Sequence, residues 1–167
     1  MATIKAIFSL FEVILFAVGI IPLNTNINYG GDKYVAPTIE TPMYIVENSE
    51  TDYVIVTEEN PSECILTAVN EFQTYIEKIS GAEIEHITEN KISDSQNAVI
   101  IKNSELKDLA DDGFTLKSDG KNLYISGGSD RGTLYGVYTF LEEYLGVRWF
   151  TPTLEVVPKN KDVIIDA

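Results

Sequence analysis

The sequence predicts an α+β domain, in which two principal helices pack on one face of a mixed β-sheet. Short runs rich in β-branched residues recur from about residue 43 onward, which indicates strands. Two longer segments, 61–80 and one that begins near residue 129, repeat apolar residues at helical spacing. Because each segment has a single apolar stripe, we expect both helices on the same face of the sheet.

The composition is that of one globular domain and disfavours several kinds of function. The chain has 167 residues, 44% of them hydrophobic, and a formal net charge of −14. This acidity argues against nucleic acid as a partner, because phosphate binding needs clustered basic residues and the only arginines are Arg131 and Arg148. One cysteine, Cys64, and one histidine, His86, form neither a zinc site nor an intrachain disulfide. We therefore predict no cofactor and no metal.

The same two residues also bear on nucleophilic catalysis. A Cys64–His86 pair, or a Ser–His–Asp triad built on His86, is conceivable on paper. Cys64 lies at a core-facing helical position and His86 in an alternating, strand-like stretch, so we predict structural roles for both.

Residues 1–28 have the features of a secretory signal peptide. Lys5 gives a positive start, an almost unbroken apolar run covers 6–16, and small residues follow at 17–19. The alternative is an uncleaved membrane anchor through residues 6–23, in which Glu12 would be costly. Both interpretations predict an exported protein that is periplasmic, extracellular or at the cell surface. Residues 29–42 are expected to be a linker and residues 43–167 the folded domain.

The first part of that domain is predicted to contain two strands and a long helix. The strands are a short edge strand over 43–46 and a second one over 53–57. Asn60 as a cap and Pro61 as the first residue begin a helix over 61–80, which Gly81 ends. Its apolar stripe is Ile65, Ala68, Val69, Phe72, Ile76 and Ile79.

A group of short strands follows. Residues 84–88 alternate weakly and predict an exposed strand, whereas the apolar run 98–102 is typical of a buried central strand. Residues 106–110 predict a helical turn. Residues 113–117 and 122–126 flank an Asp119-Gly120 turn and predict a β-hairpin.

The last part is predicted to be a second helix and three short strands. Ser129 and Asp130 are good caps, the apolar stripe is Leu134, Tyr138, Leu141 and Leu145, and Gly146 closes the helix. The strands are expected over 147–150, 154–157 and 163–165. Trp149 and Phe150 are neighbours in the first of them, so they point to opposite faces and one faces another layer.

The glycine-rich segment 127–136 lies between a strand and a helix, where phosphates are often bound. It lacks the Gly-Lys-Ser/Thr of a P-loop, and Ser129 replaces the second glycine of the dinucleotide fingerprint. The favoured interpretation is structural. Gly132 and Gly136 lie four apart on one helix face and would let the helix pack closely on the sheet.

Two further sets of side chains could serve carbohydrate chemistry. Paired carboxylates at 58–59, 111–112 and 142–143 could act as the acid and base of a glycosidase, although such charged pairs are more often solvated. The aromatic residues Tyr135, Tyr138, Tyr144, Trp149 and Phe150 could form a sugar-stacking surface. Helical spacing places Tyr138 in the core instead.

The order of motifs in the last third resembles a known domain. It runs from a hairpin ending in Gly127-Gly128 through Asp130-Arg131-Gly132 and residues 134–137 to Gly146, residues 148–150 and Pro152. This order resembles the N-terminal domain that precedes the catalytic barrel in α-glucuronidases and related glycoside hydrolases. It is also similar to the domain before the barrel in β-N-acetylhexosaminidases. The resemblance covers about residues 43–166 and implies an α+β fold.

The resemblance implies a non-catalytic accessory domain of an exported glycoside hydrolase, with a catalytic (β/α)8 barrel as its partner, normally in the same chain. The catalytic carboxylates of such enzymes lie on the barrel, which needs ~250 residues, and no position here matches them. A stand-alone exported carbohydrate-binding module is the alternative. An independent hydrolase is disfavoured, so we expect no enzyme activity from the chain alone.

Arg131 and Trp149 are the candidate site residues. Arg131 lies in the first turn of the second helix, where the helix dipole disfavours a cation, so we predict a compensating carboxylate or backbone acceptor. We expect both residues to serve structure and docking. Sugar contact is the less favoured role, because one exposed aromatic side chain does not make a cleft.

Overall fold

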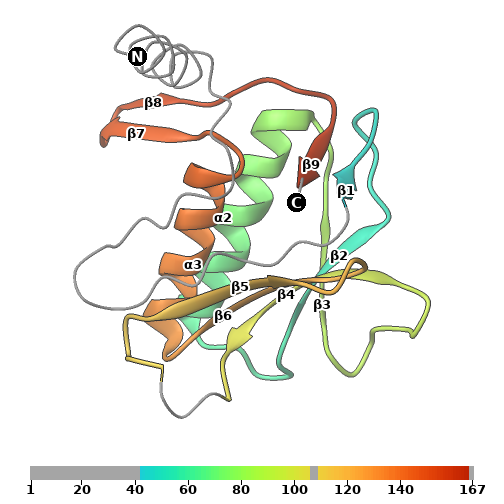
Figure 1. Ribbon diagram of the computed structural model, residues 1–167, viewed down its shortest axis with the longest axis vertical. Coiled ribbons are helices and arrows are strands. Elements are labelled where there is room, and N and C mark those ends of the chain that lie inside the picture. The colour runs from blue at the N-terminus through green and yellow to red at the C-terminus, as the bar shows by residue number, and fades with distance from the viewer. Residues whose placement is uncertain (1–41, 106–108, 166–167) are drawn as a thin grey trace, which may run out of the picture.

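The structure is a computed structural model that describes residues 42–105 and 109–165 (Figure 1). The predicted signal peptide or anchor and the linker up to residue 41 lie outside the described residues. So do residues 106–108, on which most of the predicted helical turn falls.

Five strands form a mixed sheet in the order β3-β2-β4-β6-β5. They are β2 (Tyr53–Thr57), β3 (Glu85–Thr88), β4 (Asn97–Asn103), β5 (Phe114–Ser118) and β6 (Leu123–Gly127). Strand β2 pairs in parallel with β3 and β4, and β4 with β6, whereas β5 and β6 form an antiparallel hairpin. The predicted mixed sheet, its buried central strand β4 and the hairpin are confirmed.

Helix α2 (Glu63–Ser80) begins two residues later than predicted. Ser62, not Asn60, is the N-cap, and its side chain accepts a hydrogen bond from the Ile65 amide at 3.2 Å. The correction arises because Ser62 is an equally good cap one residue beyond Pro61 and therefore starts the helix itself. The predicted apolar stripe is buried along its whole length, and Gly81 ends the helix with φ of +79°.

Helix α3 (Asp130–Glu143) begins at the predicted Ser129 cap but buries a different face. The buried residues are Gly132, Thr133, Gly136, Val137, Phe140 and Leu141. Only Leu141 of the predicted stripe is buried, and the prediction of Tyr138 as a core residue is wrong, because this side chain is half-buried. The helix ends at Glu143 with Tyr144 as its C-cap, before Gly146.

The glycines explain why α3 turns this face to the sheet. A Cβ at Gly132 would lie 2.5 Å from the Gly113 carbonyl oxygen, and one at Gly136 would lie 2.9 Å from the Ile125 methyl group. A search for periodic apolar residues does not count glycine as a buried residue. The absence of a side chain at Gly132 and Gly136 is nevertheless what permits α3 to lie so close to the sheet and to the segment before it. The structural interpretation of Gly132 and Gly136 is confirmed.

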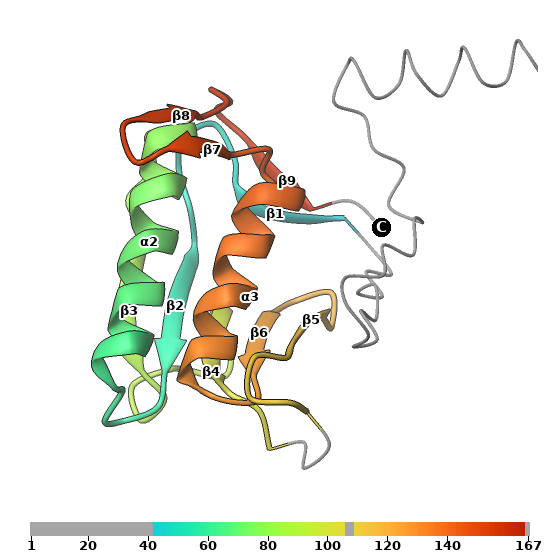
Figure 2. The same ribbon diagram turned by 90° about the vertical axis from the view of Figure 1, so that its left-hand side faces the viewer.

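Both helices cover the same face of the five-stranded sheet, as predicted (Figure 2). On the opposite face, Val54, Val56 and Ala98 form a small cluster with Ile92, which belongs to the connection between β3 and β4. Within the described ranges, neither helix combines the length and the apolar character needed to cross a membrane.

Two additional pairs of strands complete the fold. Strand β1 (Met43–Val46) is the predicted short strand, but it pairs antiparallel with β9 (Val163–Ile165) outside the main sheet. Strands β7 (Arg148–Thr151) and β8 (Leu154–Val156) form a separate antiparallel hairpin. Met43, Ile45, Val163 and Ile165 are buried, so β1 and β9 belong to the core.

Candidate functional site

The β7–β8 hairpin lies at the C-terminal ends of both helices (Figure 1). Its register shifts between Trp149 and Thr151, and Pro152 lies in the turn between the two strands. Such an irregularity twists a short strand pair and leaves one residue outside the regular pairing. In this hairpin that residue is Phe150.

Basic side chains connect this region to the ends of the helices. The Arg148 guanidinium donates to the Glu142 carbonyl at the end of α3, and the Lys159 ammonium donates to the Lys78 carbonyl at the end of α2. The Asn160 amide donates to the Ile79 carbonyl at 3.0 Å. The last carbonyls of a helix lack partners within it and carry the negative end of its dipole. The bond from Arg148 therefore fixes the hairpin to α3, and the bonds from Lys159 and Asn160 fix the segment after the hairpin to α2.

The inner face of the hairpin is held by a chain of hydrogen bonds to α2. The Trp149 indole donates to the Tyr75 hydroxyl at 2.5 Å, and this hydroxyl donates to Glu155 at 2.5 Å. The Lys78 ammonium donates to the other Glu155 oxygen at 2.7 Å. The Trp149 ring also meets the rings of Tyr75 and Tyr138 edge to face, with centroids 5.3 and 5.5 Å apart.

These contacts change the titration of the groups involved. The hydrogen bonds from Lys78 and Tyr75 lower the pKa of Glu155, and the bond to Glu155 raises the pKa of Lys78. Burial, together with the bond to Glu155, raises the pKa of Tyr75. The network therefore favours an ionised carboxylate that is fully engaged within the domain.

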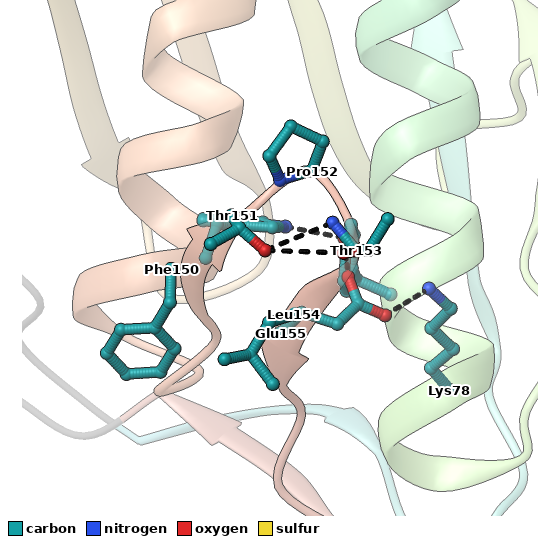
Figure 3. A pocket seen from close by; sticks show the side chains of 9 residues that line it. Lys78, Phe150, Thr151, Pro152, Thr153, Leu154 and Glu155 are labelled. Atoms are coloured by element: carbon teal, nitrogen blue, oxygen red, sulfur yellow. Dashed lines mark hydrogen bonds and ion pairs between the residues drawn. The ribbon is translucent and has the colours of Figure 1, made fainter.

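The outer face of the hairpin is exposed and apolar. Phe150 is 64% exposed, Leu154 56% and Val156 52%. Figure 3 shows the Phe150 and Leu154 side chains extending together, away from Lys78. The hairpin and the end of α2 also border an open depression of about 570 Å³. We call Phe150, Leu154 and Val156 the outer face.

Trp149 and Phe150 point to opposite faces, as the sequence predicts, and Trp149 is the one that faces a neighbouring layer. Its ring and its N–H both contact the helices, which leaves little of it for a sugar. Of the two residues, Phe150 is the exposed one, and the sequence alone did not single it out. The alternation of side chains along a strand predicts that the two residues point to opposite faces, but it does not predict which of them is exposed.

Arg131 lies at the other end of the domain, in the first turn of α3. Its guanidinium makes an ion pair with Asp112 at 2.5 Å, which raises the pKa of Arg131. The predicted compensating carboxylate is thus confirmed. Both side chains are more than half exposed, so the pair is a surface interaction. Arg131 and Trp149 are not brought together.

The space beside the glycine-rich segment before α3 is occupied by backbone atoms of the protein itself. A Cβ at Gly127 would lie 2.0 Å from the Thr133 amide nitrogen, and one at Gly128 would lie 2.1 Å from the Ala110 carbonyl oxygen. Hydrogen bonds from Ser62 and from the Asn103 amide lower the pKa of Asp130, so an anion of the chain already occupies the space between the two helix N-termini. This arrangement agrees with the structural interpretation of the segment.

Three sets of candidates remain: His86, Cys64 and the paired carboxylates. His86 lies in β3, where its ring nitrogen is 2.9 Å from the Thr57 hydroxyl, and burial lowers its pKa. Cys64 is half-buried in the first turn of α2. Across the described ranges, no group of three His, Cys, Asp or Glu residues is placed to hold a metal ion. Of the paired carboxylates, Asp112 binds Arg131, and 142–143 are half-buried at the end of α3.

Comparisons with known proteins relate this fold to glycoside hydrolases. The family described as Glycosyl hydrolase family 67 N-terminus matches residues 45–140, from β1 into α3. "Probable alpha-glucuronidase A" of Aspergillus terreus (strain NIH 2624 / FGSC A1156) is 33% identical over 85 residues, which cover 45% of this chain and 10% of that protein. The chain therefore spans about a tenth of the length of this curated relative.

Two solved structures are also similar. A "GH138 enzyme targeting pectin rhamnogalacturonan II" has 17% sequence identity and a TM-score of 0.43, covering 55% of this chain and 10% of that one. CpGH84D has 14% identity and a TM-score of 0.43, covering 82% of this chain and 24% of that one.

Proposed function

The chain belongs to the family described as Glycosyl hydrolase family 67 N-terminus, and from this premise we propose that it is a non-catalytic accessory domain of an exported glycoside hydrolase. In the complete enzyme this domain docks on a catalytic barrel, which carries the chemistry. The observation that carries the proposal is the match over residues 45–140, which takes in the whole five-stranded sheet, all of α2 and most of α3.

The state of the carboxylates supports a role other than hydrolysis. A retaining or inverting glycosidase needs two facing carboxyl groups across a cleft, one of them with a raised pKa. The pKa of Asp119, Asp130 and Glu155 is lowered by hydrogen bonds, so these groups are poor acids for this purpose. They serve a turn, a pair of helix N-termini and the hairpin.

Two observations test this proposal directly. The reading frame that adjoins codon 167 in the source genome should encode a barrel. The purified chain should release no product from aryl glucuronides or aryl N-acetylhexosaminides, and turnover above that of a heat-denatured sample would refute a non-catalytic role.

Export rests on residues 1–28 and has its own test. N-terminal sequencing of the secreted protein should find a new terminus soon after Gly19. An intact Met1 on a membrane-bound product would favour the anchor over residues 6–23.

A stand-alone carbohydrate-binding module is the second candidate, and the exposed Phe150 ring favours it. An aromatic platform of this kind can stack on the apolar face of a sugar ring. Calorimetric titration with glucuronoxylan fragments distinguishes the two functions. Saturable binding by the parent chain, lost in Phe150→Ala at an unchanged melting temperature, would establish the module and displace the accessory domain.

A further inference from the structure

We infer that the outer face of the β7–β8 hairpin is the surface through which this domain docks, and that its occupant is the barrel of the same glycoside hydrolase, at a patch with an apolar centre and an acidic rim. This inference rests on the proposed function and adds the surface and the chemistry of the partner.

The outer face has the composition of a protein interface. Phe150, Leu154 and Val156 are all more than half exposed and lie within one short hairpin. Contiguous exposed apolar side chains with a polar rim mark interaction sites, and interface centres are depleted of charge and rich in aromatic residues. The one carboxylate in the two strands, Glu155, is already paired with Lys78.

Charge selects the kind of protein that fits. Residues 147–165 hold three basic and two acidic side chains, whereas the rest of the chain holds nine basic and 24 acidic ones. Lys78, Arg148 and Lys159 surround the base of the hairpin through their bonds to Glu155 and to the helix ends. Glu155 neutralises Lys78, whereas the carbonyl partners of Arg148 and Lys159 carry no formal charge. An acidic rim on the partner would therefore meet the charges of Arg148 and Lys159, and would be repelled elsewhere on this domain.

The same contacts disfavour other occupants. Two copies facing each other through this hairpin would oppose their own cations, and an anionic lipid surface would be repelled by the strongly acidic remainder of the chain. A sugar needs unoccupied polar groups beside the aromatic ring, but Tyr75, Lys78, Trp149 and Glu155 bond to one another.

The hairpin is also prepared for binding. It is fixed to α2 through Trp149 and Glu155 and to α3 through Arg148. A surface held in place before contact loses less conformational entropy on binding than a mobile loop does. The outer face can therefore bind without rearrangement of the domain.

The test places the photo-crosslinker p-benzoylphenylalanine at position 150 of the natural protein, expressed with the barrel encoded by the adjoining frame. The control places it at Tyr135, which is 42% exposed on α3. Irradiation should link position 150 to barrel peptides with at least a tenfold higher yield than position 135. Peptide mapping of a link to a second copy of this chain would overturn the inference in favour of self-association.

The other outcomes distinguish an error in the assigned docking surface from an error in the proposed function. Links to the barrel from position 135 but not from position 150 would overturn the outer face and leave the accessory function standing. An adjoining frame without a barrel, or a barrel linked from neither position, would overturn the proposed function and this inference together.

Exposed-residue substitutions give an independent check. Phe150→Ser and Leu154→Ser should each weaken association with the barrel by about tenfold or more, as the loss of a central apolar contact does. Tyr135→Ser, which removes an exposed ring elsewhere, should leave the association unchanged. Raising NaCl from ~0.1 M to ~1 M should weaken it too, because the rim charges are screened. Parent-like affinity in both hairpin variants would contradict the assignment.

Discussion

Phe140→Ala tests which face of helix α3 carries the domain's stability. Phe140 is 1% exposed, and its ring stacks on Phe72 and Tyr144, with centroids 5.6 and 5.5 Å apart. Truncating a buried Phe to Ala costs about 3–5 kcal/mol through lost burial and a residual cavity. Two stacked neighbours place this case near the top of that range, at about 4–5 kcal/mol. For a domain of this size, this corresponds to a melting temperature lower by about 15 °C.

The informative comparison is Leu134→Ala. The apolar spacing of the sequence makes Leu134 a core residue, whereas the structure leaves it half-buried, so its truncation should cost no more than about 2 kcal/mol. Urea unfolding followed by tryptophan fluorescence measures both variants. A Leu134→Ala loss equal to or larger than that of Phe140→Ala would refute the assigned face. Phe140→Leu gives a milder third point if the alanine variant does not fold.

Three further predictions concern a glycine, a turn and the two candidate site residues. Gly132→Ala should lower the free energy of unfolding by about 1–3 kcal/mol, because its Cβ would lie 2.5 Å from the Gly113 carbonyl oxygen; stabilisation in urea unfolding would contradict this. The pKa of Asp119 is lowered from 3.8 to about 2, so its contribution to stability is present above about pH 4 and is lost as the pH falls towards 2. Asp119→Asn should therefore flatten the pH dependence of unfolding in this window, and an unchanged slope would exclude Asp119 as its source. Trp149→Ala should lower the melting temperature clearly, whereas Arg131→Ala should change it little and less still at high salt, as calorimetry can show.

The low pKa of Asp119 arises within the turn that the sequence predicted at Asp119-Gly120. Burial opposes ionisation, but the amides of Asn122 and Lys121 and the hydroxyl of Tyr124 all donate to this carboxylate. The Asp-Gly pair predicted the turn, and Gly120 adopts φ of +84° in it. A turn of this kind can be predicted from a sequence because Asp119 and all its hydrogen-bond partners lie within six consecutive residues.

Helix α2 was predictable for a related reason. Its stripe consists of large apolar residues at strict helical spacing, and all of them are buried. Helix α3 was predicted to exist, but its buried face was wrong. Two glycines and a threonine form much of that face, and their role depends on how close the neighbouring backbone comes. The hydropathy of single residues does not predict the distance between two segments of backbone.

Contacts between residues that are far apart in the sequence were the second feature that the sequence did not predict. The pairing of β1 with β9 joins the two ends of the domain, and the bond from Trp149 to Tyr75 joins a strand to a helix far away in sequence. The sequence placed Trp149 and Phe150 on opposite faces without deciding which one is outside. That choice depends on where α2 lies, so only the structure shows that Phe150, rather than Trp149, is the exposed residue of the pair.

Hydrogen–deuterium exchange on this chain, alone and with its catalytic barrel, tests the central claim most directly. If the domain is an accessory module that docks through the outer face, amides of residues 148–156 should gain protection in the presence of the barrel. The N-terminal turns of α2 and α3, where Ser62 and Asp130 lie, should keep their exchange rates. Unchanged exchange across the hairpin, with new protection at those helix N-termini, would contradict the account.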